Sequence, residues 1–270
     1  MKYDPVKKTL GNIFNKAAWM RKLFYRLLDL LLLRAWYIKR EIKNLYRGRR
    51  NDAIQMLDAG CGYGQYDFFV SSYLKKSQIL GVDVKQEQID DCNQFFAKIG
   101  RGDRVKFEYA DLTEFTKPDT YDLVLSVDVM EHILEDEKVF QNLCKSLRKG
   151  GVLLISTPSD QGGSDVHDEH EHSFIDEHVR DGYNIDDIAQ KLRNAGFSDV
   201  NAKYSYGTPG SIAWTLTMKI PIIMVNASKL LLILLIPYYI AVYPWAFVLN
   251  WIDTITTHKT GTGLIVKAVK

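Results

Sequence analysis

Short apolar runs alternate with amphipathic stretches through the middle of the chain. The apolar runs predict six strands, at residues 54–57, 79–83, 105–112, 121–127, 152–157 and 200–206. The stretches between them predict helices at residues 65–74, 86–99, 136–147 and 184–195. Because strand and helix alternate, we expect an α/β fold with a doubly wound, mainly parallel sheet that binds its ligand at the carboxyl ends of the strands.

The pattern changes after the sixth predicted strand. Residues 220–251 are nearly all apolar, and the run is long enough for a transmembrane helix. Pro237 and Pro244 predict breaks in it, which leave helices of about 15 residues, too short for a hydrocarbon core of ~30 Å. Residues 263–269 alternate like a strand that returns to the sheet, so we expect two broken helices that dip into one leaflet. The alternative is a hydrophobic lid or a dimer interface.

A helical apolar stripe near the N-terminus predicts a helix at residues 16–40, with Arg21, Lys22 and Arg26 beside the stripe. It is either a cap over the ligand site or a basic amphipathic helix in a membrane interface. Residues 1–50 hold 14 Lys and Arg against three acids, whereas the other 220 residues hold 21 against 30. A basic arm on an acidic body suggests an anionic partner, either phospholipid or nucleic acid. No nucleic-acid reading motif is recognisable, so the membrane is favoured.

The residues that carry chemistry follow the first predicted strand, where Asp58 precedes glycines at every second position, Gly60, Gly62 and Gly64. Glycine lets the backbone bend sharply and approach a ligand closely, and the next helix directs its free N–H groups to the same point. The second strand ends in Asp83, where nucleotide-binding folds keep a carboxylate for ribose hydroxyls. The spacing therefore predicts a small polar ligand with a nucleoside part.

Five segments resemble the class I S-adenosylmethionine-dependent methyltransferases: DAGCGYG, GVDV, YADL, YDLVLSVDVMEHI and LRKGGVLLISTP. The resemblance covers roughly residues 53–206 and the C-terminus. It implies a Rossmann-like, seven-stranded sheet whose last strand, at residues 263–269, is antiparallel, with a hydrophobic helical insertion before it. The implied domains are a basic amphipathic region at 1–50, a methyltransferase domain at 51–206 and 261–270, and a membrane-contacting insertion at 207–260.

The same resemblance implies S-adenosyl-L-methionine as the cofactor. The cofactor-binding residues that it implies are Asp58, Gly60, Gly62, Gly64, Asp83, Val84, Asp111, Leu112 and Val127. The glycines would face the methionine end and Asp58 its amino group. Asp83 would hold the ribose hydroxyls, and Asp111 with Leu112 the adenine.

A loop at residues 157–183 contains four of the six histidines of the chain. No pair of them has the i, i+4 spacing of a helical metal site, and the family mostly needs no metal, so none is expected. The loop follows the fifth strand and should lie over the substrate pocket. His170 or His172 is therefore the candidate general base, and a solvated loop histidine is the alternative reading.

These patterns together predict an enzyme that methylates a lipophilic, membrane-associated small molecule: a quinone precursor, polyene, phenol or lipid. Residues 16–40 and 220–252 would contact anionic lipid. Cys61, Cys92 and Cys144 show no pairing or metal spacing, and no signal peptide is apparent, so we expect the cytoplasmic side of the membrane, with peripheral or monotopic attachment. The alternatives are a methyltransferase of a soluble molecule, with the apolar insertion as a lid or homodimer interface, and a non-catalytic cofactor-binding scaffold.

Overall fold

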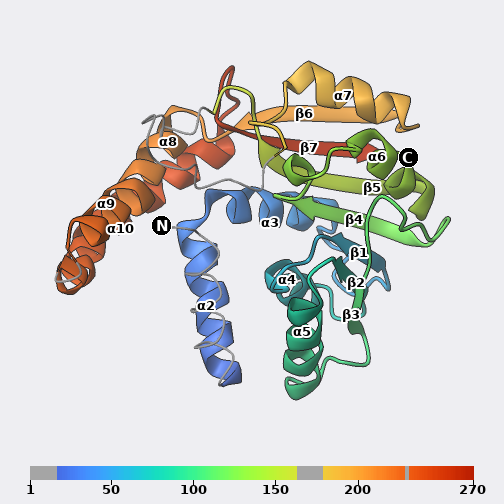
Figure 1. The fold of residues 1–270 in the computed structure, drawn as a ribbon, viewed down its shortest axis with the longest axis horizontal. Helices are drawn as coiled ribbons and strands as arrows, with labels where there is room; N and C mark the ends of the chain where they lie inside the picture. The colour runs from blue at the N-terminus through green and yellow to red at the C-terminus, as the bar shows by residue number, and fades with distance from the viewer. Residues whose placement is uncertain (1–16, 163–178, 229–230) are drawn as a thin grey trace.

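A computed structural model describes residues 17–162, 179–228 and 231–270. Seven strands form one sheet: β1 (Gln55–Ala59), β2 (Gln78–Asp83), β3 (Val105–Tyr109), β4 (Tyr121–Val127), β5 (Leu147–Pro158), β6 (Asp199–Ser205) and β7 (Gly263–Val269). Their order in the sheet is β3-β2-β1-β4-β5-β7-β6 (Figure 1). Strands β1 to β5 pair in parallel, and β7 runs antiparallel to both of its neighbours. The predicted fold class is confirmed.

Strand β7 shows why the end of the chain alternates in polarity. Leu264, Val266 and Ala268 are buried in the core on one face of the sheet, while Ile265 is buried in the core on the other face. Successive side chains of a strand point to opposite faces, so a strand with covered faces on both sides needs apolar residues at nearly every position.

Helices cover both faces of the sheet. They are α2 (Ala18–Leu31), α3 (Leu33–Leu45), α4 (Gln65–Tyr73), α5 (Gln86–Lys98), α6 (Asp136–Ser146) and α7 (Ile185–Asn194), with a short 3₁₀ turn η1 (Met130–His132) after β4. Helices α2 to α5 contribute to one hydrophobic core, and α6 and α7 contribute to the other. This arrangement leaves the carboxyl edge of the parallel strands free for a ligand.

The helix predicted at residues 16–40 is wrong as one continuous element. Leu32 is extended, with φ −99° and ψ 107°, and separates α2 from α3. Figure 1 shows the two helices at a steep angle to one another. The break lets α3 lie along the sheet with Ile38 and Ile42 buried, while α2 packs against α4 and α5 through Tyr25 and its neighbours.

A helical arm connects β6 to β7. It consists of α8 (Thr208–Trp214), a π-helical turn η2 (Thr215–Lys219), α9 (Ile220–Ala227) and α10 (Leu232–Ile255). Helices α9 and α10 project beyond the sheet (Figure 1). We refer to α8, η2, α9 and α10 together as the arm.

The breaks predicted at Pro237 and Pro244 are wrong, because α10 runs through both prolines. A proline removes one backbone donor and can kink a helix without ending it. The chain leaves α9 at Ser228, which is extended. In the preceding part of the arm, Pro221 has no N–H to donate to the backbone carbonyls of Thr217 and Leu216. These two carbonyls instead accept hydrogen bonds of 2.7 Å from the hydroxyls of Tyr239 and Tyr238 in α10.

Asp253, near the end of α10, fastens the arm to the rest of the protein. Its side chain is fully buried and accepts hydrogen bonds from the Tyr37 hydroxyl at 2.6 Å and the Gly210 N–H at 2.9 Å. A Cβ at Gly210 would lie 2.6 Å from Leu33 and 2.7 Å from Asp253, so glycine permits α8, α3 and α10 to meet. His258 lies 3.3 Å from the same carboxylate.

We expect Asp253→Ala to lower the free energy of unfolding by about 2 kcal/mol, because it leaves the buried Gly210 N–H without an acceptor. It also removes one acceptor of the Tyr37 hydroxyl, which keeps the backbone carbonyl of residue 253 at 2.8 Å. Urea unfolding followed by circular dichroism measures the change. Thr257→Ala, an exposed position four residues away, is the matched control and should stay within about 0.5 kcal/mol of the wild type. Equal stability of the two variants would contradict the assignment of Asp253 as the fastening point.

Candidate functional site

The glycine turn joins β1 to α4 at the carboxyl edge of the sheet. Gly60, Gly62 and Gly64 all have positive φ, at 85°, 51° and 71°. A Cβ at Gly60 would overlap the Val129 side chain, so glycine is required there for space as well as for conformation. The N–H groups of Gly60 and Cys61 both donate to the Val82 carbonyl, at 2.8 and 3.0 Å, which ties the turn to β2.

Asp83 lies at the end of β2 beside this turn. Its Oδ2 accepts a hydrogen bond of 2.9 Å from the Gly62 N–H, and its Oδ1 accepts one of 3.0 Å from the Lys85 N–H. An ionised carboxylate has about four acceptor positions, so two remain for other donors. The geometry fits the predicted role of Asp83 in holding two ribose hydroxyls.

A buried pair of carboxyl groups lies beneath the turn. Asp58 is 2% exposed and Asp67, in the first turn of α4, is 0% exposed. Within the described residues, Asp58 Oδ2 and both carboxylate oxygens of Asp67 lack a hydrogen-bond donor. Burial raises the pKa of Asp67 to about 7, and burial together with Asp67 raises the pKa of Asp58 well above its ordinary value. Such a pair fits a cationic amino group, as the methionine end of the cofactor would supply.

Sequence reasoning predicted Asp58 but missed Asp67. The signal was present, because an acid in the first turn of a helix that opens at a glycine turn has its carboxylate near the free N–H groups.

The remaining predicted cofactor-binding residues lie along the same carboxyl edge of the sheet. Asp111 Oδ1 accepts two hydrogen bonds of 2.8 Å from Thr113. Leu112 is buried, Val84 is 55% exposed, and Val127 ends β4.

Helix α2 supports the turn from behind. Arg21 is only 2% exposed, and it donates to the Tyr63 carbonyl at 2.8 Å and pairs with Asp91. The Tyr25 hydroxyl donates to the same carbonyl at 2.5 Å. Placing Arg21 on the exposed face with Lys22 and Arg26 was therefore wrong: a guanidinium can satisfy several acceptors inside the protein, and the turn supplies them. The inner face of α2 thus packs on the glycine turn, and a cap over the ligand site stays a prediction.

Three residues that sequence reasoning missed face the site from other elements. Arg34 of α3 pairs with Asp128, with 2.5 Å between Nη1 and Oδ2, and its backbone N–H donates to the Tyr206 hydroxyl at 3.1 Å. Asp128 and Tyr206 both have positive φ, 52° and 53°, without being glycine. Such backbone conformations are uncommon and cluster at functional sites.

Glu131 is a further residue that sequence reasoning missed. It follows β4, is 1% exposed, and accepts a hydrogen bond of 3.1 Å from the Thr157 hydroxyl at the end of β5. Burial and the charge of Asp128 raise its pKa to about 8. The only signal in the sequence was its place in the segment that resembles the family motif, directly after the fourth strand.

His170 and His172 lie outside the described residues, so their catalytic role stays a prediction. The chain on either side of them is well anchored. Before them, the Ser159 hydroxyl donates to the Gly261 carbonyl at 2.5 Å, and after them the Val179 N–H donates to the Glu131 carbonyl at 3.1 Å. Both flanks therefore lie at the carboxyl edge of the sheet.

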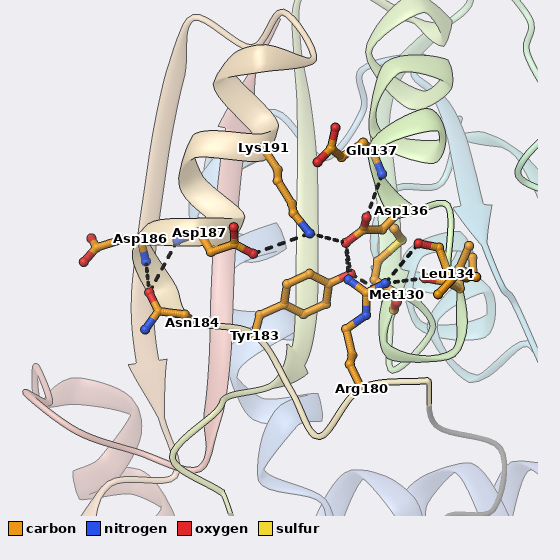
Figure 2. Close-up of polar contacts among 11 residues, drawn as sticks. Met130, Leu134, Asp136, Glu137, Arg180, Tyr183, Asn184, Asp186, Asp187 and Lys191 are labelled. Carbon is orange, nitrogen blue, oxygen red and sulfur yellow. Dashed lines mark hydrogen bonds and ion pairs between the residues drawn. The ribbon is translucent and has the colours of Figure 1, made fainter.

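Figure 2 shows a cluster that fixes the second flank. Asp136 at the start of α6 pairs with Arg180, lies 3.0 Å from Lys191 of α7, and accepts a hydrogen bond of 2.8 Å from the Tyr183 hydroxyl. Burial alone would raise the pKa of Asp136, but these hydrogen bonds and the two cations outweigh it and lower that pKa. The cluster holds residues 180–183 against η1 and hence beside Glu131.

A cavity of about 480 Å³ opens beside Tyr206, between the loops at the carboxyl ends of β5 and β6 and the helices α8 and η2. A second cavity, of about 230 Å³, is lined by Tyr46, Asp122 and Gly150 among others. It lies at the amino ends of the strands, across the sheet from the glycine turn. Of these two cavities, the first lies on the side of the cofactor residues.

Comparison with known proteins agrees with this geometry. A family model described as "Methyltransferase domain" matches residues 50–196, more than half of the chain. The chain is a class I S-adenosylmethionine-dependent methyltransferase. It is thus an enzyme with S-adenosyl-L-methionine as its cofactor, and the glycine turn, Asp83 and the buried acid pair are suited to hold that molecule.

Relatives with curated names share only part of their length with this methyltransferase. It is 33% identical over 150 residues to phosphoethanolamine N-methyltransferase of Triticum aestivum, covering 55% of this chain and 29% of that protein. It is 29% identical over 102 residues to 27-O-demethylrifamycin SV methyltransferase of Amycolatopsis mediterranei, covering 37% of each. A solved structure, Haemonchus contortus phosphoethanolamine N-methyltransferase 2 in complex with S-adenosyl-L-methionine, shares the fold, with a TM-score of 0.59, 22% identity, and 86% and 52% coverage.

We expect Asp83→Ala to weaken the binding of S-adenosyl-L-methionine more than tenfold. It removes the acceptor for two hydroxyls, each hydrogen bond to a charged group is worth about 1.5–3 kcal/mol, and tenfold corresponds to about 1.4 kcal/mol. Titration calorimetry measures the affinity. Asp103→Ala, an exposed aspartate away from the turn, should bind normally. Unchanged affinity in Asp83→Ala would overturn the role of this carboxylate.

We expect the cofactor-free enzyme to lose stability as the pH rises from 5 to 7. The raised pKa of Asp67 means that the folded state keeps a proton that the unfolded chain has lost, so the free energy of unfolding falls through this window. Asp67→Asn cannot ionise and should make the profile less steep, with a gain of roughly 1–3 kcal/mol at pH 8. Some slope should remain, because the pKa values of Asp58 and Glu131 are raised as well. Urea unfolding at several pH values tests this, with Asp103→Asn expected to follow the wild type. Parallel profiles for Asp67→Asn and the wild type would refute the raised pKa.

Proposed function

We propose that this methyltransferase acts on a lipophilic, membrane-associated small molecule, and that it is held on the cytoplasmic face of the membrane as a peripheral or monotopic protein. The observation that carries the proposal is α10. The most apolar 18 residues within Ile233–Ile255 have a mean hydropathy of 1.6, yet only 11% of them are buried by the protein. Ile233, Ile236, Ile240 and Trp245 are each at least 70% exposed. A continuous apolar surface of this kind indicates an apolar partner.

By length and composition α10 could cross a membrane, but its attachment to the body favours partial insertion. From Tyr243 onward α10 contacts the body: the Tyr243 hydroxyl donates to the Leu30 carbonyl, and the Phe247 ring packs edge-on against Trp36, with 4.9 Å between centroids. Residues 233–242 precede these contacts and are about 15 Å long as a helix, half of a hydrocarbon core of ~30 Å. The arm also starts and ends in one sheet, at β6 and β7.

The outer face of α2 supports the same partner. Trp19 is 65% exposed, and Leu23, Leu27 and Leu30 on the same helical face are 40–42% exposed. Lys22 and Arg26, also exposed, flank these residues. Apolar side chains with cations beside them suit an interface with anionic lipid, where each cation contributes about 1 kcal/mol. Because Arg21 is buried, Lys22 and Arg26 take the place of the three-cation basic face that is expected from the sequence.

Methyl transfer depends mainly on the alignment of the acceptor with the cofactor, and less on activation of the acceptor. The cofactor, when bound, supplies a methyl group on a positively charged sulfur, which any suitably placed nucleophile can accept. The turn and Asp83 orient the ribose and methionine parts. Glu131 lies at the ends of β4 and β5, and with its pKa raised to about 8 its carboxyl group could take a proton from an acceptor hydroxyl once it is ionised. His170 and His172 remain alternatives for this step.

A soluble acceptor is the second candidate, with the arm as a lid or homodimer interface. It draws support from the wheat and nematode relatives, whose names specify phosphoethanolamine. Helix α10 packs one face on η2 through Tyr238 and Tyr239, and its other face, which is apolar, is exposed. A lid that only closed the site would not need an exposed apolar face of this kind.

The test combines binding and turnover on vesicles made from a total lipid extract of the cells that produce the protein. With methyl-labelled cofactor, label should enter the organic phase, and the protein should cosediment with the vesicles. Ile236→Asp with Ile240→Asp should lower both at least tenfold, because charges in hydrocarbon are costly, while cofactor binding stays unchanged. The matched control, Ile236→Leu with Ile240→Leu, should behave like the wild type. Label confined to the aqueous phase, with no cosedimentation, would favour the soluble acceptor.

A further inference from the structure

The cavity beside Tyr206 lies where a methyl acceptor would have to enter. One side of it is Tyr206 and Gly207 at the end of β6, and another is Gly261 and Thr262, directly before β7. Tyr206 also connects the cavity to the cofactor side, since its hydroxyl accepts the Arg34 N–H and Arg34 pairs with Asp128 at the end of β4. Tyr206 and Arg34 therefore connect the cavity to the carboxyl end of β4.

The described lining of this cavity carries hydroxyl groups and no charged side chain. Among the described residues that line it there is no Lys, Arg, His, Asp or Glu. Five Ser and Thr hydroxyls lie beside its apolar surface. Those of Ser211 and Thr215 donate to nearby carbonyls, at 3.1 and 2.9 Å, whereas those of Thr208, Thr260 and Thr262 make no hydrogen bond within the described part of the chain. Three hydroxyls are thus left to bind a ligand, each as donor or acceptor.

Charges near the cavity disfavour an anion. Two cations at this edge, Arg34 and Arg180, are engaged with Asp128 and Asp136, and His258 lies 3.3 Å from the Asp253 carboxylate. Lys259 precedes Thr260 in the chain, is exposed, and does not line the cavity. The sequence at 163–178, whose flanks lie at the same edge, contains six acids and no Lys or Arg. Recognition of a phosphate normally uses several Arg or Lys side chains, and a charge that enters a site without a counter-charge pays a large desolvation cost.

One side of the cavity is apolar and continues into the arm. Ile212 and Leu216 belong to α8 and η2, and Ile212 is 46% exposed. The next helix in the chain is α9, with the exposed Ile222 and Ile223. An apolar tail could follow these side chains from the cavity to the exposed surface of the arm.

We propose that this cavity binds the head of the methyl acceptor, and that the head is uncharged, carrying hydroxyl or carbonyl groups, with an apolar tail directed along the arm. The inference rests on the proposed function, since it names the substrate class of the same site. It separates this enzyme from relatives named for phosphoethanolamine, whose substrate carries a phosphate.

Four probes separate the head from the tail: hydroquinone and phosphoethanolamine, each with and without a ten-carbon alkyl tail. Their binding to the full chain loaded with S-adenosylhomocysteine is measured at equilibrium in uncharged detergent micelles. We expect decyl hydroquinone to bind at least tenfold more tightly than decyl phosphoethanolamine. If it does not, the inference about the head is overturned. If the tailed probes bind no more tightly than the tailless ones, the lipophilic acceptor is overturned, while the preference for a neutral head is judged from the tailless pair.

Variants then locate the head. Thr208→Val with Thr262→Val keeps the shape of the cavity but removes two of its three unbonded hydroxyls. We expect affinity for decyl hydroquinone to fall five- to tenfold and affinity for S-adenosylhomocysteine to stay constant. Thr120→Val with Thr254→Val, which changes two threonines outside the cavity, is the matched control and should bind both ligands normally. Unchanged binding of decyl hydroquinone to the first variant would place the head elsewhere and overturn the assignment of this cavity.

Discussion

The insertion of β7 between β5 and β6 is the constraint on which the rest of the structure depends. Its backbone pairs with seven residues on each side, from Pro158 to Val152 in β5 and from Ser205 to Asp199 in β6. Because β7 is antiparallel, it starts at the carboxyl edge where both neighbours end. The chain that leaves β6 must therefore return to the same edge. This requirement brings Tyr206 and Thr262 together as two walls of one cavity and places both ends of the arm beside the cofactor residues.

Helix α3 links the arm to the cofactor side. Two residues of α3 contact α10: the Tyr37 hydroxyl donates to the Asp253 carboxylate, and the Trp36 ring packs against the Phe247 ring. One turn earlier, Arg34 pairs with Asp128 and contacts Tyr206. A rigid helix holds these contacts in fixed relation, because its backbone hydrogen bonds allow little bending over three residues. The exposed apolar surface and the catalytic edge are thus parts of one packed unit.

The electrostatics of the site divide it into two regions. Beneath the glycine turn, Asp58 and Asp67 form an acidic pocket in which burial disfavours ionisation until a cation arrives. Beside Tyr206 the cavity offers hydroxyls and no charge. A cofactor with a cationic amino group and sulfonium suits the first region, and an uncharged acceptor head suits the second.

The sequence alone determined the sheet and the cofactor edge. Period-two and continuous apolar runs mark strands wherever a sheet is covered on one or both faces, and the glycines with Asp83 are local signals, since each acts within a few residues of its own strand. Only the tertiary structure decided the fate of side chains whose partners are distant in sequence. Arg21 looked like a surface cation until the turn at Tyr63 supplied acceptors, and Pro237 and Pro244 looked like helix ends although α10 continues through both. Asp67, Glu131 and Tyr206 acquire their character from burial and from neighbours on other elements, and burial is a property of packing that no local pattern encodes.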